Sequence, residues 1–103
     1  MTGTARSSEG LDLRRRRLLF RAWRRGTREL DLIMGRFADE AIGTLSDAEV
    51  GEFERLCDVP DLELYAWVVG SRPVPANYDT DLFRRLCAFN HAAAAGLDGD
   101  TAG

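Results

Sequence analysis

The sequence contains no lysine, so that all of its fourteen basic residues are arginine. It also has one histidine, two cysteines and no long apolar run, and each of these three shortages excludes a class of protein or site. No uncharged stretch approaches the roughly 18 residues that a membrane-spanning helix needs, so we expect no membrane insertion. A single histidine, His91, leaves little for a histidine-based metal site or a catalytic triad. Cys57 and Cys87 lack zinc-site spacing and lie within apolar helical patterns, so they are predicted to be small core residues.

The N-terminal residues are not expected to form a targeting segment. The polar N-terminus lacks the apolar core of a secretory signal, and Glu9 and Asp12 are unlike an acid-poor mitochondrial transit peptide. We therefore expect a cytoplasmic protein. The length of 103 residues suits one domain, predicted at 11–93, between flexible segments at 1–10 and 94–103.

Charge is distributed unevenly along the chain. Residues 1–28 hold nine arginines against two acids, whereas residues 29–103 hold five arginines against fifteen acids, which gives the net charge of −3. At helical spacing the first segment gathers its arginines on the side opposite Leu19, Ala22 and Trp23. This arginine face could dock an acidic protein or nucleic acid, or it could balance the acidic remainder of the same domain.

Hydrophobic residues recur with helical periodicity in five segments, and no segment alternates like a strand. The pattern predicts an all-α fold, a compact bundle of five short helices. They are expected at about 11–25, 27–42, 46–57, from 58–61 to 70, and 80–91. The fourth is expected to place Leu64, Tyr65, Trp67 and Val68 on its apolar face. The core positions expected of the second and third are Leu30, Ile33, Met34, Phe37, Ala41, Ile42, Val50, Phe53, Leu56 and Cys57. Gly26 is predicted to end the first helix, Thr27 to cap the second, and Ser46 with Glu49 to form a capping box.

Charged residues of both signs crowd around Gly26, where the first helix is predicted to give way to the second. They are Arg24, Arg25, Arg28, Glu29 and Asp31. A helical junction is normally exposed, and glycine lets another backbone approach closely. The cluster therefore predicts an exposed, rigid patch that binds a protein partner or an anionic ligand. Neither a Gly-rich phosphate loop nor a nucleophile paired with histidine is present, so we expect no enzyme.

Several motifs together resemble a known family. The segment RGTRE at 25–29 is an R-G-x-x-E motif, which continues as LDLIMGRF at 30–37 and is followed by LSDAE at 45–49 and PDLELYAW at 60–67. Over roughly 14–91 the chain resembles the succinate dehydrogenase assembly factor 2 family, which includes the bacterial FAD assembly factors. Thr27 and Arg28 stand at the variable positions of the motif and make it more polar here than in many relatives.

The resemblance implies a five-helix bundle and a chaperone-like function. Members bind the flavoprotein subunit of succinate dehydrogenase, and in some bacteria that of fumarate reductase, and promote covalent attachment of FAD to a histidine of that subunit. Arg25, Gly26 and Glu29 would form the contact with the partner, with Arg28 and Asp31 beside them. FAD would belong to the partner, so the chain would hold no stable cofactor and would be a monomer when free.

Two alternatives remain open from the sequence. The first is a small helical binding module that uses its N-terminal arginine face to dock another acidic protein or nucleic acid. An acidic sequence pI near 5.1 and the lack of a recognition-helix motif argue against nucleic acid. The second is a carrier that brings FAD to the partner, for which the sequence offers no dinucleotide-binding motif.

Overall fold

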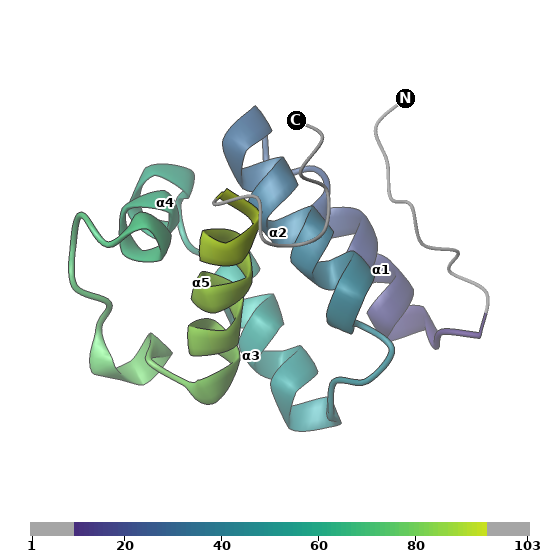
Figure 1. Ribbon diagram of the computed structural model, residues 1–103. Helices are drawn as coiled ribbons and strands as arrows, with labels where there is room; N and C mark the ends of the chain where they lie inside the picture. Colours follow the sequence, from purple (N-terminus) through teal and green to yellow (C-terminus); the bar gives the residue numbers. More distant parts are fainter. Residues whose placement is uncertain (1–9, 95–103) are drawn as a thin grey trace.

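The computed structural model describes residues 10–94, and within that range the chain forms five α-helices and one short 3-10 turn, without a strand (Figure 1). In chain order these are α1 (Leu13–Ala22), α2 (Arg28–Ala41), α3 (Asp47–Cys57), α4 (Asp61–Val69), η1 (Ala76–Tyr78) and α5 (Asp81–Ala94). The predicted all-α bundle of five helices is confirmed. The predictions of flexible segments at 1–10 and 94–103 fall almost wholly outside the described residues.

The helices enclose one apolar core, with α1 and α4 at opposite edges of the bundle (Figure 1). α1 packs on α2 and α3, α5 packs on both α2 and α3, and α4 packs chiefly on α5. Phe37 of α2 lies at the centre, with edge-to-face contacts to Phe53 and Phe89 at centroid distances of 5.8 and 5.7 Å. Offset and edge-to-face aromatic pairs of this kind add to the stability that burial gives.

Side-chain caps fix where four of the helices begin. Oδ1 of Asp12 accepts a hydrogen bond from the Arg15 amide at 2.8 Å at the start of α1. The Thr27 hydroxyl accepts a hydrogen bond from the Leu30 amide at 3.3 Å, and Thr80 does the same for Phe83 at 3.1 Å. Ser46 and Glu49 form the reciprocal capping box that the sequence predicted. Each cap pairs an amide that would otherwise lack an acceptor in the first turn.

The first helix is shorter than predicted. α1 ends at Ala22 with Trp23 as its cap, so residues 24–27 form a loop and Gly26 does not terminate the helix. Tertiary contacts draw the chain away from the helix axis at this point. The indole of Trp23 packs over Gly35 and donates from Nε1 to Asp39 at 3.2 Å.

The predicted core positions are largely confirmed. Leu64, Trp67 and Val68 of α4 are buried, as are the expected apolar residues of α2 and α3. Cys57 is buried and Cys87 half-buried, both as free thiols, and burial raises the pKa of each. Tyr65, predicted on the apolar face of α4, is instead 39% exposed.

The described residues contain neither a membrane-spanning helix nor a cluster of metal ligands. No helix between residues 10 and 94 is both long enough and apolar enough to cross a bilayer. Within the same range, no three His, Cys, Asp or Glu side chains gather where they could share a metal ion.

Candidate functional site

The loop between α1 and α2 is held in place by Arg25. Its backbone amide donates to Oδ1 of Asp31 at 2.5 Å. Its guanidinium donates through Nη1 to the carbonyl of Cys57, and through Nη2 to the carbonyl of Val59 at 2.7 Å and to Oδ1 of Asp61 at 2.8 Å. Arg25 therefore ties this loop to the connection between α3 and α4.

The prediction that Arg25 is exposed is wrong, since its side chain is only 7% exposed. The physical reason is the chain end of α3. The last carbonyls of a helix have no donor within the helix, so the Cys57 carbonyl at the end of α3 can accept a hydrogen bond from elsewhere. A planar guanidinium can bind this carbonyl, that of Val59 and the Asp61 carboxylate at once. Arg25 thus lies beneath the charged patch of which it was predicted to be an exposed member. Its predicted part in partner binding would be indirect.

Asp31 also faces inward. It is half-buried and accepts the hydrogen bond from the amide of Arg25, so it fixes the path of the loop. Asp31 was predicted to contact the partner directly, but in this position it would support the loop that carries the contact residues. Arg25 and Asp31 are the two members of the predicted set that the structure turns toward the protein itself.

Gly26, Arg28 and Glu29 are exposed together at the start of α2. Gly26 has φ +106°, a conformation that residues with a side chain rarely adopt. A Cβ built there would lie 3.5 Å from Oδ2 of Asp61, which is ordinary van der Waals contact, so space alone does not require glycine. Between residues 10 and 94, neither Arg28 nor Glu29 has an ion-pair partner.

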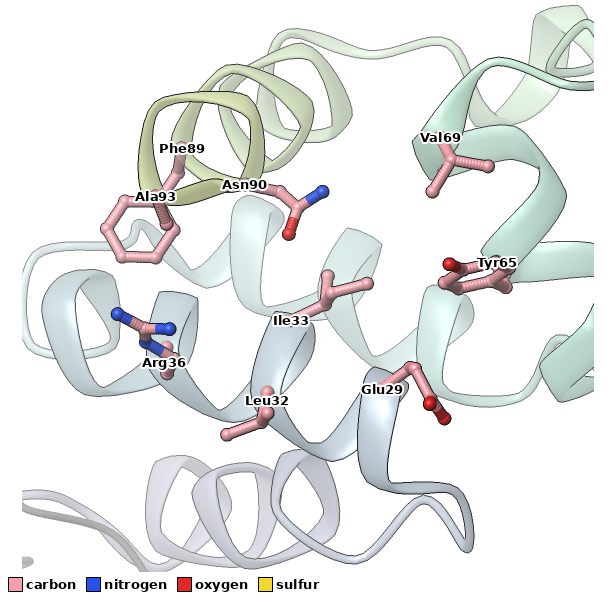
Figure 2. Close-up of a pocket in the computed structure, with 9 residues that line it drawn as sticks. All are labelled: Glu29, Leu32, Ile33, Arg36, Tyr65, Val69, Phe89, Asn90 and Ala93. Carbon is pink, nitrogen blue, oxygen red and sulfur yellow. The ribbon is translucent and has the colours of Figure 1, made fainter. Parts of the chain in front are cut away.

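Glu29 also lies at the end of an apolar groove that the sequence analysis missed (Figure 2). The groove has a volume of about 330 Å³ and is bounded by α2, α4 and α5. Figure 2 shows Tyr65 and Val69 of α4 facing Ile33 of α2, with Asn90 of α5 beyond it. A second cavity of about 280 Å³ adjoins it and shares Glu29 and Tyr65, with Leu62 and Asp61 on its wall.

A signal for this groove was present in the sequence. α4 is apolar on two faces, because Leu62, Tyr65 and Val69 follow one another at three- and four-residue spacing beside the buried set. A helix that is apolar around most of its surface must bury a second face against something. Periodicity alone predicts Tyr65 on the buried face of α4, but its exposure of 39% places it on this second apolar face.

The arginine face of α1 is largely paired within the protein. Arg14 donates to both carboxylate oxygens of Glu54 at 3.0 and 2.8 Å, and Arg21 donates to Asp58 at 2.7 Å. The hydrogen bonds from Arg14 lower the pKa of Glu54. Arg15 reaches the carbonyl of Leu45 at 2.6 Å. These pairs agree with the interpretation that the face balances the acidic remainder of the domain, whereas Arg16 and Arg17 make no ion pair within residues 10–94.

The chain matches one protein family over most of its length. The family described as "Flavinator of succinate dehydrogenase" matches residues 16–90, a range that contains residues 25–31 and every residue of the groove except Ala93. Among similar proteins, the FAD assembly factor SdhE of Acetobacter pasteurianus is 38% identical over 80 residues, which are 78% of this chain and 73% of that protein.

Mitochondrial proteins named succinate dehydrogenase assembly factor 2 are also similar. That of Mycosarcoma maydis is 38% identical over 73 residues, which are 71% of this chain and 31% of the relative. That of Danio rerio is 30% identical over 86 residues, which are 82% of this chain and 54% of the relative. The chain thus spans between about a third and about half of these mitochondrial relatives and most of the bacterial one.

Proposed function

The chain belongs to the family of succinate dehydrogenase flavinators, and from this premise we propose that it is an assembly factor that promotes covalent FAD attachment to the flavoprotein subunit of that enzyme. The observation that supports the proposal is the way in which the R-G-x-x-E segment is folded, with its arginine buried and its glycine and glutamate exposed. Buried Arg25 fixes the loop, and Gly26 and Glu29 are presented on it without partners of their own among the described residues. An exposed charge held on a rigid support suits recognition of another protein.

Glu29 would make the central polar contact. It lies in the first turn of α2, beside the groove and next to exposed Gly26, where no side chain blocks the approach of a partner. Arg28 borders the same surface. Arg25 and Asp31 act behind it, as positioning residues that hold the loop.

The contribution to flavin attachment would be one of placement. The flavin and the acceptor histidine of the subunit carry the chemistry, and FAD belongs to the subunit and not to this chain. By holding a mobile part of the subunit, the bundle would keep the reacting groups aligned. Alignment of reacting groups can lower a barrier by as much as about 7–11 kcal/mol, so no catalytic residue of the chain is required.

Three further expectations belong to this proposal. The flavoprotein subunit of fumarate reductase would be a second client, since the resemblance extends to factors that serve it in some bacteria. The free chain would be a monomer that binds one subunit at a time. It would act in the cytoplasm.

The test is covalent flavinylation of the purified apo subunit with FAD, with and without the chain, read as in-gel flavin fluorescence of the denatured subunit. Loss of a desolvated charged contact costs about 2–5 kcal/mol, so Glu29→Ala is expected to weaken the complex by about 30-fold or more. Glu40→Ala is the matched control, because Glu40 is equally exposed on α2 but lies near its other end. Equal flavinylation with and without the wild-type chain would overturn the proposed function.

A further inference from the structure

Exposed apolar side chains at the groove indicate that another molecule docks there. On α4, Leu62 is 85% exposed and Val69 47% exposed, and across the groove Leu32 of α2 is 38% exposed. Single exposed apolar residues are common, but Val69 and Leu32 line the same groove, together with Ile33 and Phe89 (Figure 2), and Leu62 lines the smaller cavity that adjoins it. A contiguous apolar surface of this kind marks an interaction site.

The charges around the groove indicate the chemistry of the occupant. Glu29 has no ion-pair partner among residues 10–94, and Asp61 engages Arg25 through Oδ1. Both carboxylates line the smaller cavity, where the ring of Tyr65 forms part of the wall. Two carboxylates beside an aromatic ring attract a cationic side chain, through ion pairing and through the face of the ring.

We propose that the groove binds a segment of the flavoprotein subunit in which an apolar anchor is followed closely by an arginine or lysine. The apolar anchor fills the larger cavity over Ile33 and Val69. The basic group enters the smaller cavity between Glu29 and Asp61 and lies against Tyr65. This inference rests on the proposed function and names the part of the client that the same surface recognises.

The geometry also explains why Arg25 is buried next to this surface. Its ion pair with Asp61 connects the start of α2 to the start of α4, which are the two walls of the smaller cavity. The same contact compensates the charges of both Arg25 and Asp61, so the uncompensated negative charge at the smaller cavity is that of Glu29, and Oδ2 of Asp61 remains as an acceptor. Arg28 lines neither cavity, and Arg36 lines only the larger one.

The test places a photoreactive benzoylphenylalanine at position 69, in the groove, and at position 13 as the control. Leu13 is 53% exposed on α1, outside the groove, so the two positions are matched in exposure and apolar character. Each full-length variant is irradiated with the apo flavoprotein subunit, and the crosslinked peptide is identified by mass spectrometry. We expect position 69, and not position 13, to label a subunit segment that holds an arginine or lysine within about one helical turn of its apolar anchor.

A second readout tests the charge. Glu29→Gln in the position-69 variant is expected to lower the crosslink yield by about tenfold, the effect of a loss near 1.4 kcal/mol. An unchanged yield, or a labelled segment without a basic residue, overturns the proposal. So does a crosslink to a second copy of the chain or to its own residues 95–103.

The two levels of failure are distinguishable. If the wild-type chain promotes flavinylation but position 69 labels nothing, only the groove assignment is overturned. If the wild-type chain neither binds the subunit nor promotes flavinylation, the proposed function and the groove assignment fall together. Thermal unfolding of each variant shows that it is folded before its crosslinking is compared.

Discussion

The guanidinium of Arg25 lies 2.8 Å from Oδ1 of Asp61 and joins the loop before α2 to the first turn of α4. α4 packs chiefly on α5, so this ion pair is a principal link between α4 and the start of α2. In the proposed contact the arginine of the R-G-x-x-E segment would therefore act through the position of its neighbours. Gly26 and Glu29 are exposed, and Arg25 fixes where they lie relative to Tyr65.

The first prediction concerns the stability that Arg25 provides. Arg25→Ala leaves Asp61 and two backbone carbonyls without their donor, and breaking a buried charged pair in this way costs about 3 kcal/mol or more. Arg25→Lys is expected to recover only part of it, since an ammonium cannot bind three acceptors in one plane. Urea unfolding followed by circular dichroism measures both.

Arg28→Ala is the control for that series. Arg28 is exposed and close in sequence, and removal of a surface side chain of this kind changes stability by less than about 0.5 kcal/mol. If Arg25→Ala unfolds at the same urea concentration as Arg28→Ala, Arg25 does not brace the loop. The original interpretation of Arg25 as a surface contact would then be preferred.

The second prediction concerns Gly35, on which the indole of Trp23 is seated. A Cβ at this position would lie 2.3 Å from Cδ2 of Trp23, so the ring must move. Alanine in a helix is otherwise favoured over glycine by about 1 kcal/mol. Gly35→Ala is expected to destabilise the protein in spite of this gain, as a lower thermal midpoint with weaker near-ultraviolet dichroism from Trp23.

Gly51 gives the matched comparison within a helix. A Cβ there would meet only Nη2 of Arg14 at 3.4 Å, the far end of a flexible side chain. Gly51→Ala is therefore expected to raise stability by about 0.5–1 kcal/mol. Stabilisation by both substitutions would contradict the packing of Trp23 on Gly35.

Much of the fold could be predicted from sequence because its signals are local. Helical periodicity, the capping box of Ser46 and Glu49, and the cap of Thr27 each depend on residues within a few positions of one another. The core of α2 and α3 followed from the same periodicity. The family resemblance identified the R-G-x-x-E motif at residues 25–29 as the predicted contact site.

The parts that could not be predicted depend on contacts between distant residues. The burial of Arg25 depends on carbonyls at Cys57 and Val59, more than 30 positions away, which no local pattern indicates. The end of α1 likewise depends on the packing of Trp23 against Gly35, a residue of another helix. The groove differs, because the second apolar face of α4 was readable from spacing and was overlooked.

The third prediction separates backbone strain from bulk at Gly26. At φ +106°, any residue with a side chain is strained by about 1–2 kcal/mol, so Gly26→Ala and Gly26→Arg are expected to lose similar stability. Only the arginine carries bulk and charge into the approach of a partner. We therefore expect Gly26→Ala to bind the flavoprotein subunit nearly as wild type and Gly26→Arg to lose the complex, measured by size exclusion. Equal loss by both would make Gly26 a backbone requirement alone.

The last prediction uses the two thiols as reporters of the loop. Burial raises the pKa of Cys57, and the backbone carbonyl of the same residue accepts a hydrogen bond from the guanidinium of Arg25. A raised pKa keeps the thiol protonated, so its reaction with a disulfide reagent is expected to be slow near neutral pH. The rate would keep increasing as the pH rises above the ordinary cysteine range, because only the thiolate reacts.

Arg25→Ala removes that anchorage and lets the end of α3 open more often. We therefore expect Cys57 to be labelled about tenfold faster or more in Arg25→Ala, the change that 1.4 kcal/mol of lost local stability produces. Half-buried Cys87 is the internal reference, because it lies on α5 and makes no hydrogen bond to Arg25, so its rate is expected to change much less. Mass spectrometry of the labelled peptides follows both thiols in one sample. Equal acceleration at the two cysteines would indicate global destabilisation, and no acceleration at either would place Arg25 outside the support of this loop.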